Sequence, residues 1–148
     1  MTSLEKSTRA RMISRLIRRR FRRNHRFSAP NAVPNCVLVS PMRNEGPYIL
    51  EWLAWHRAVG FTEILVISNN CTDGSDALLS FLAARGFLYH ATHDPQAGTF
   101  ALNSAYEVAY KHPVVLRADW VMAIDADEFL VVHVGDNTVQ SLISQNGQ

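Results

Sequence analysis

Residues 120–129 read Trp120-Val121-Met122-Ala123-Ile124-Asp125-Ala126-Asp127-Glu128-Phe129, an apolar run that ends at two carboxylates one residue apart. The pattern predicts a buried strand that carries an Asp-x-Asp pair to its carboxyl end. Alternate side chains of an extended chain point the same way, so Asp125 and Asp127 are expected to face one cation while Ala126 faces away. Mg²⁺ and Mn²⁺ bind few protein carboxylates and keep positions for phosphate oxygens and water. The pair therefore predicts a Mn²⁺ or Mg²⁺ site for a phosphate-bearing ligand.

Two other interpretations of this acidic pair have to be considered. Acidic residues also end strands because turns favour them, so a plain turn is the alternative to a metal site. An EF-hand calcium loop is excluded, because the sixth position counted from Asp125 is Leu130, where that loop needs glycine. The choice between a metal site and a turn depends on the rest of the sequence.

The charges divide the chain into a basic arm and an acidic body. Of the 148 residues, 47% are hydrophobic, which is enough for the core of a single domain. Residues 1–26 hold 10 of the 15 Lys and Arg and one acid, Glu5, so the remainder has 5 basic and 12 acidic residues and a net charge of −7. Cys36 and Cys71 show no Cys-x-x-Cys spacing, so reduced thiols in a cytosolic setting are expected.

The arm predicts a peripheral contact with an anionic membrane. Within residues 9–26, arginines alternate with apolar residues at helical spacing, as in a short basic helix that lies on anionic lipid. These apolar residues are Met12, Ile13, Leu16, Ile17 and Phe21. A disordered, solvated arm and a nucleic-acid contact are the alternatives, and nucleic acid is the least favoured. No apolar run is long enough to span a bilayer and no secretory signal is expected, so the predicted location is the cytoplasm, with contact at the inner face of the membrane.

The predicted organisation has three parts. Residues 1–27 form the basic arm, helical or disordered; residues 28–35 form a linker with two prolines; and residues 36–148 form the domain. Strands are expected at 36–40, at 64–68, at 87–90 and in the run before Asp125, with helices near 48–59, 76–84 and 100–111. This alternation predicts a mostly parallel sheet with helices on both faces, and such sheets bind ligands outside the carboxyl ends of their strands.

That rule brings three polar segments to one crevice. Arg43, Asn44 and Glu45 follow the first strand, residues 69–75 follow the second, and the Asp-x-Asp pair follows the last. We expect Arg43 to offset phosphate charge and Glu45 to accept hydrogen bonds from a ribose or base. The chain has neither a Gly-x-Gly-x-x-Gly fingerprint nor a Walker A lysine, which argues against a dinucleotide enzyme or a phosphate-loop ATPase. The phosphate is therefore expected to bind through a metal.

Taken together, these motifs resemble a family of sugar-transferring enzymes. They are Arg43-Asn44-Glu45, Glu51-Trp52-Leu53-Ala54-Trp55-His56, Thr72-Asp73-Gly74-Ser75 and Asp125-Ala126-Asp127-Glu128-Phe129. In this order and spacing, over residues 36–143, they are similar to the family 2 glycosyltransferases of the GT-A type, in the bacterial branch. The resemblance implies an α/β fold, the GT-A (Rossmann-like) sheet, and transfer of a sugar from a nucleotide-diphosphate donor to an acceptor hydroxyl.

The resemblance also implies roles for individual residues. Asp127 would bind the metal most directly, and Asp125 would bind the metal or the donor sugar and ribose. The donor-binding set implied is Arg43, Asn44, Glu45, Asn69, Asn70, Asp73 and Asp125, and the metal ligands are Asp125 and Asp127. The family often has an acid after the second strand, where this chain has Ser68, Asn69 and Asn70, so the donor is left as UDP- or GDP-linked. The acceptor would be a glycan or another hydroxyl.

In the family, the acceptor site and the catalytic base follow the Asp-x-Asp strand. We therefore expect the general base to be absent from this chain and the sheet to be incomplete at its C-terminal side, with an uncovered edge. Residues 129–138 predict a further strand and turn, and Thr138 is expected to cap a helix that begins at Val139. The alternatives are a truncated or degenerate nucleotide-sugar-binding module without turnover, and a nucleotidyltransferase.

Structural roles are predicted for several other polar or aromatic residues. His56 is expected to pack with a hydrogen bond, and Trp52 and Trp55 to lie in the core. His90 and His93 are interpreted as ordinary polar surface, and His133 is not expected to bind a metal.

Overall fold

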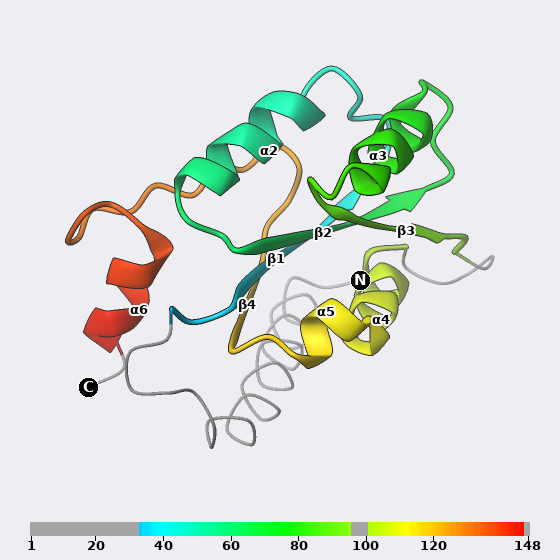
Figure 1. Ribbon diagram of the computed structural model, residues 1–148. Helices are drawn as coiled ribbons and strands as arrows, with labels where there is room; N and C mark the ends of the chain where they lie inside the picture. Colours follow the sequence, from blue (N-terminus) through cyan, green and yellow to red (C-terminus); the bar gives the residue numbers. More distant parts are fainter. Residues whose placement is uncertain (1–32, 96–100, 147–148) are drawn as a thin grey trace, which may run out of the picture. The chain divides into compact units, whose positions relative to one another are not determined.

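The computed structural model describes residues 33–95 and 101–146, drawn in colour in Figure 1. Residues 35–148 belong to one compact unit. The predictions for the basic arm and for residues 28–32 of the linker lie outside the described residues. Within those residues, no helix combines the length and the apolar character needed to cross a bilayer.

In the described residues, four parallel strands form one sheet. They are β1 (Cys36–Met42), β2 (Glu63–Asn69), β3 (Tyr89–His93) and β4 (Trp120–Ala123), in the order β3-β2-β1-β4. In the register of the central pairs, Val39 lies opposite both Leu65 and Ala123. The two central strands are almost entirely buried, which explains their unbroken apolar sequences. The predicted parallel sheet is confirmed.

Helices cover both faces of the sheet (Figure 1). The helices α2 (Ile49–Ala58), α3 (Ser75–Ala84) and α6 (Val139–Asn146) pack through Trp52, Leu79 and Val139 with Leu38 and Ile64 of the sheet. On the other face, α4 (Ala101–Lys111) and α5 (Pro113–Leu116) pack through Ala105 and Val114 with Val39 and Leu65. Neighbouring strand residues thus serve opposite cores, as the alternation of a strand requires.

The last strand ends one residue earlier than predicted, and its residues are half-buried or exposed rather than buried. β4 ends at Ala123, because its pairing with β1 ends there, and the amide of Ile124 donates the next hydrogen bond to the carbonyl of Val39 at 3.2 Å. The acidic pair therefore lies beyond the strand, in a turn closed by the Glu128 amide and the Asp125 carbonyl at 3.2 Å. The further strand predicted within residues 129–138 was also wrong, since this segment has no strand in the structure.

Two other boundaries differ from the sequence prediction. β3 begins at Tyr89 rather than at Phe87, because Phe87 remains in the exposed turn after α3. The short helix α5 was not predicted; Pro113 occupies its first turn, and the His112 side chain accepts a hydrogen bond from the Val114 amide at 3.3 Å. The predicted cap of α6 is present, since Thr138 Oγ1 accepts from the Ser141 amide at 3.3 Å.

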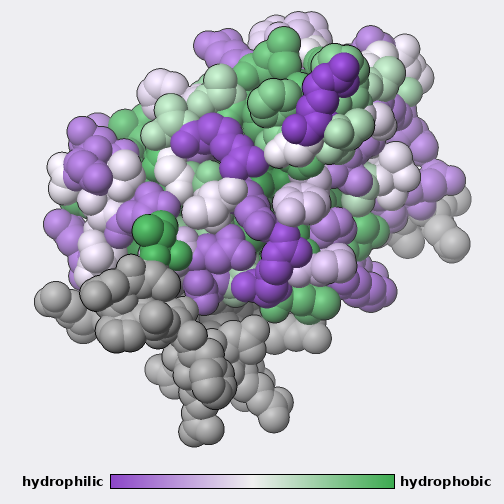
Figure 2. Space-filling model, in the orientation of Figure 1, coloured by the Kyte–Doolittle hydropathy of each residue, from purple (hydrophilic) through white to green (hydrophobic). Residues whose placement is uncertain are grey.

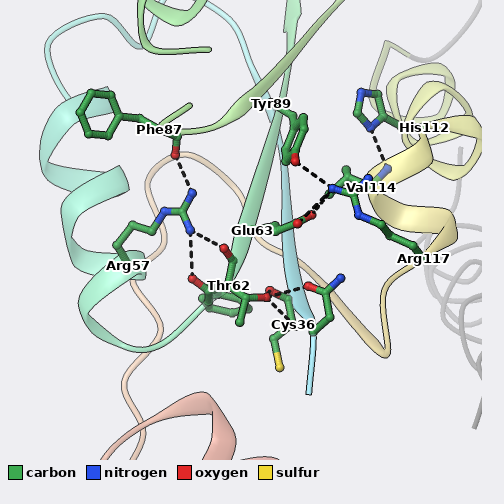
Figure 3. Close-up of polar contacts among 11 residues, drawn as sticks. Cys36, Arg57, Thr62, Glu63, Phe87, Tyr89, His112, Val114 and Arg117 are labelled. Atoms are coloured by element: carbon green, nitrogen blue, oxygen red, sulfur yellow. Dashed lines mark hydrogen bonds and ion pairs between the residues drawn. The ribbon is translucent and has the colours of Figure 1, made fainter. Parts of the chain in front are cut away.

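Two arginines brace the amino-terminal edge of the sheet (Figure 3). Arg117 donates to Glu63 at 2.9 Å and to the Tyr89 hydroxyl at 2.8 Å. Arg57 donates to the carbonyls of Thr62 and Phe87. Polar side chains at this edge thus hold strands and helices together. The face of the molecule drawn in Figure 2 carries a mixture of polar and apolar side chains.

Candidate functional site

The loops after β1 and β2 are joined at the carboxyl edge of the sheet. Asn44, in the left-handed conformation with φ 58°, accepts from the Thr72 amide at 2.8 Å and donates to the Thr72 hydroxyl at 3.3 Å. The side chain of Asn70 donates to Asp94 at 2.9 Å and so links the loop after β2 to the residue that follows β3. Both asparagines were predicted to bind the donor; in the structure, their side chains connect loops.

Asp73 is a second connection between the same loops. Its carboxylate accepts from the Ser75 amide at 2.9 Å, from the Ser75 hydroxyl at 2.8 Å and from the Gly46 amide at 3.1 Å. A Cβ on Gly46 would lie 3.1 Å from Asp73 Oδ2, so glycine allows this close approach. The hydrogen bonds from Ser75, the largest cause, hold the pKa of Asp73 below its usual 3.8. The geometry therefore gives Asp73 a role in loop structure; donor contact stays a prediction.

We expect Asp73→Ala to lower the melting temperature, because the Gly46 amide and the start of α3 lose their acceptor. The pKa of Asp73 is lowered in the folded chain, so its contribution is present above pH 3.8 and is lost as the pH falls through the folded value. The difference in melting temperature between wild type and variant should therefore shrink in acid. Melting curves against pH measure it, with Glu51→Ala, an exposed acid in the first turn of α2, as the control. An equal effect of both variants would contradict the role of Asp73.

The acidic turn after β4 concentrates negative charge at the same edge. Ala126 is 9% exposed, while Asp125 and Asp127 on either side of it are exposed. Partial burial, and then the nearby carboxylates of Glu128 and Asp127, raise the pKa of Asp125 above its usual 3.8. A bound divalent cation offsets the repulsion between neighbouring carboxylates. The carboxylate oxygens of Asp125 and Asp127 therefore suit Mn²⁺ or Mg²⁺ as ligands. The described residues contain no group of three or more His, Cys, Asp or Glu placed to hold a metal, so any ion here would take its other ligands from phosphate and water.

Helix α4 also contributes to the surroundings of this turn. Burial, and then the charge of Asp125, raise the pKa of Tyr106 to about 12. Glu128 Oε2 accepts from the Asp125 amide at 3.1 Å, which keeps a third carboxylate close to the pair. Sequence reasoning missed both Tyr106 and Glu128 as parts of the site.

Helix α2 holds the segment that follows the acidic pair, which runs beside it in Figure 1. Trp52 Nε1 donates to the Glu128 carbonyl at 3.1 Å, and Trp55 Nε1 donates to the Leu130 carbonyl at 2.9 Å. The Leu130 amide donates to His56 Nε2 at 3.3 Å. The packing role predicted for His56 is confirmed, whereas Trp55 is 42% exposed and not a core residue. The i, i+3, i+4 spacing of Trp52, Trp55 and His56 in the sequence indicates that the three rings lie on one face of a helix.

His90 and His93 are anchored by hydrogen bonds. The side chain of His90 is only 6% exposed, and its Nε2 lies 2.8 Å from Ser68 Oγ, so the interpretation of His90 as polar surface was wrong. His93 Nε2 lies 2.7 Å from Ser104 Oγ. His133 is exposed.

We expect the free energy of unfolding to fall as the pH drops below 6.5. Burial, the largest cause in each case, lowers the pKa of His56, His90 and His112 below 6.5 in the folded chain. The unfolded chain then binds these protons first, so stability is full above pH 6.5 and is lost as the pH falls toward the folded values. Urea denaturation between about pH 5 and 8 measures this, and a smaller decline in His56→Gln is the control. A free energy of unfolding that stays constant or rises on acidification in this range would contradict the prediction.

The outer edge of β4 borders an apolar surface. Among the described residues, β4 pairs with β1 alone. A hollow of about 350 Å³ beside it is lined by Met122, Ile124 and Phe129, and Val131 nearby is 55% exposed. This is the sheet edge that the sequence predicts to be uncovered, and no other strand of the described residues pairs with it.

Comparisons with known proteins relate the chain to glycosyltransferases in sequence. No protein-family model matches the chain. A glycosyltransferase family 92 protein of Ricinus communis is 28% identical over 109 residues, which cover 71% of this chain. The chain spans only 18% of the length of that relative.

Two solved structures share the fold. S. aureus TarS 1–349 gives a TM-score of 0.51 at 17% identity, over 76% of this chain and 31% of that one. The mannosyltransferase PcManGT from Pyrobaculum calidifontis, in complex with GDP-Man and Mn²⁺, gives 0.50 at 22% identity, over 88% of this chain and 39% of that one. The chain is thus a glycosyltransferase homologue with a GT-A-like α/β fold, as the sequence predicted. Membership of family 2 stays a prediction.

Proposed function

We propose that this chain binds the nucleotide-diphosphate-sugar donor of a metal-dependent glycosyltransferase of the family 2 type. The observation that carries the proposal is the acidic turn at the carboxyl edge, where burial and neighbouring carboxylates raise the pKa of Asp125. In an open parallel sheet, ligands bind at this edge. The sequence relation to a glycosyltransferase supports transfer of a sugar rather than another nucleotide chemistry.

In the proposed site, Asp127 and Asp125 hold Mn²⁺ or Mg²⁺. A bound divalent ion would offset the charge that develops on the diphosphate as the glycosidic bond breaks. Arg43 is exposed on the loop after β1 and would add positive charge for the phosphates. Glu45 and Asn44 are proposed to contact the nucleoside, and Asn69, Asn70 and Asp73 to contact other parts of the donor. Asn44, Asn70 and Asp73 also join neighbouring loops.

The proposed donor is UDP- or GDP-linked, and the proposed acceptor is a glycan or another hydroxyl. The similar fold of a mannosyltransferase that binds GDP-Man and Mn²⁺ makes a GDP-sugar the first to test. The arm, residues 9–26, is proposed to contact an anionic membrane, on the strength of its arginines and helical apolar spacing.

Isothermal titration of the chain with UDP- and GDP-sugars, with Mn²⁺ or with a chelator, tests the proposal. We expect binding of one class of nucleotide sugar that is lost when the chelator removes the metal. Loss of binding in Asp127→Ala, with Glu107→Ala on α4 as an exposed acidic control, would assign it to this turn. A folded chain that binds neither donor, or that binds equally with chelator, would contradict the proposal.

A further inference from the structure

We infer that Trp52, Trp55 and His56 of α2 are positioning residues, which fix the backbone after the acidic pair and thereby the direction of the two carboxylates toward a divalent cation. This inference rests on the proposed function. It assigns to the Glu-Trp-Leu-x-Trp-His segment a part in metal affinity, beyond the packing of a helix on a sheet.

The three rings hydrogen-bond to two residues, Glu128 and Leu130, on one short stretch of backbone. Trp52 donates to the carbonyl of Glu128, the residue directly after Asp127, at 3.1 Å. Leu130 is held on both sides, since its carbonyl accepts from Trp55 at 2.9 Å and its amide donates to His56 at 3.3 Å. These bonds replace the strand pairing that residues 128–130 lack in the structure.

His56 can make its hydrogen bonds to Trp52 and Leu130 in one protonation state alone. Its Nδ1 lies 2.8 Å from the Trp52 carbonyl, which can only accept, so Nδ1 carries the proton. Nε2 must then be an unprotonated acceptor for the Leu130 amide. The imidazole is fully buried, and burial lowers its pKa, which favours the neutral form. The ring of Phe129 stacks on it at 5.9 Å and 20°.

The acidic pair thus lies on a short backbone segment, residues 124–128, that is held by a hydrogen bond at each end. At one end, the Ile124 amide donates to the Val39 carbonyl in the sheet at 3.2 Å. At the other end, Trp52 holds Glu128. Between the anchors, Asp125 and Asp127 are exposed, and the buried methyl group of Ala126 fixes the middle. Ligands are effective when their supporting partners keep them in place, so loosening one anchor should weaken metal binding.

The best test variant is Trp55→Phe, because Trp55 is 42% exposed and the change removes its donor to Leu130 at little cost to packing. Changes in groups that support metal ligands cost about 10- to 100-fold in affinity, and we expect a loss in this range for Mn²⁺. His56→Leu should lose at least as much, and His56→Gln should recover part of it, because its amide oxygen can accept from the Leu130 amide. The matched control is Leu82→Ala, in the same core cluster but on α3, which should destabilise the fold and keep Mn²⁺ affinity.

Mn²⁺ affinity is measured by calorimetry on each variant well below its melting temperature, and amide hydrogen exchange of residues 125–131 is measured without metal. Weaker Mn²⁺ binding together with faster exchange in Trp55→Phe, and normal binding in Leu82→Ala, supports the inference. If the wild type binds Mn²⁺ and Trp55→Phe and His56→Leu bind it equally well, the inference fails and the proposed function stands. If the folded wild type binds Mn²⁺ neither alone nor together with a GDP- or UDP-sugar, both fail.

Discussion

Asp125→Asn is expected to raise the melting temperature of the metal-free chain while it lowers Mn²⁺ affinity more than about 100-fold, beyond the usual effect of a supporting residue. Partial burial and the carboxylates of Glu128 and Asp127 raise the pKa of Asp125, so charging it opposes folding. Asparagine removes that charge and one metal ligand together. The gain in stability should be absent below pH 3.8, grow as the pH rises from 3.8 toward the folded pKa and stay constant above it, because in that interval the unfolded chain has already released the proton that folded Asp125 still holds.

Melting curves with and without Mn²⁺ measure both effects of Asp125→Asn. Mn²⁺ should raise the melting temperature of the wild type, since a ligand that binds the folded state stabilises it, and should leave the variant unchanged. Glu107→Gln, an exposed acid on α4, is the control for a simple change in net charge. A variant that is less stable without metal, or that Mn²⁺ still stabilises fully, would contradict the assignment of Asp125.

Trp52→Ala is expected to cost about 3–5 kcal/mol of the free energy of unfolding, the usual range for a buried aromatic residue. Trp52 is 1% exposed and is the largest fully buried side chain in the described part of the chain. Its removal leaves a cavity in the core cluster of α2 and the sheet, and leaves the Glu128 carbonyl without its donor. Since a domain of this size has a stability of about 5–15 kcal/mol, the loss is a large share of the total.

Denaturation with urea or guanidinium measures this cost, and Trp55→Ala is the matched control on the same helix. Trp55 is 42% exposed, so its truncation leaves a smaller cavity and should cost clearly less. Equal costs for the two variants would mean that the core does not depend on Trp52 in the way that its burial indicates.

The sequence alone determined the central part of the fold. Runs such as Val37–Val39 and Ile64–Ile67 are apolar on both sides of the strand, which requires a sheet that is covered on both faces. The ends of α2 and α3 were also readable, because Gly60 and Gly86 adopt positive φ and end helices at little steric cost. The meeting of the loops after β1 and β2 follows from the parallel order of their strands, and the contact between Asn44 and Thr72 confirms it.

The tertiary structure decided how the residues at the carboxyl edge are used. Sequence patterns show which residues share a face of one element, but not which groups meet between elements that are distant in the chain. For that reason the sequence did not show that the side chains of Asn44 and Asp73 bind neighbouring loops; their contact with a donor stays a prediction. The end of β4 depends in the same way on where its pairing with β1 stops, which residues 120–129 do not encode locally.

The contrast is clearest for Trp52, Trp55 and His56. Their spacing determined that they lie on one face of α2, because side chains three and four residues apart are neighbours on a helix. Only the packed structure brings residues 128–130, more than 70 positions away in the chain, against that face. The physical reason is that backbone groups left without strand partners must find hydrogen bonds elsewhere, and the ring nitrogens of α2 are where the fold supplies them.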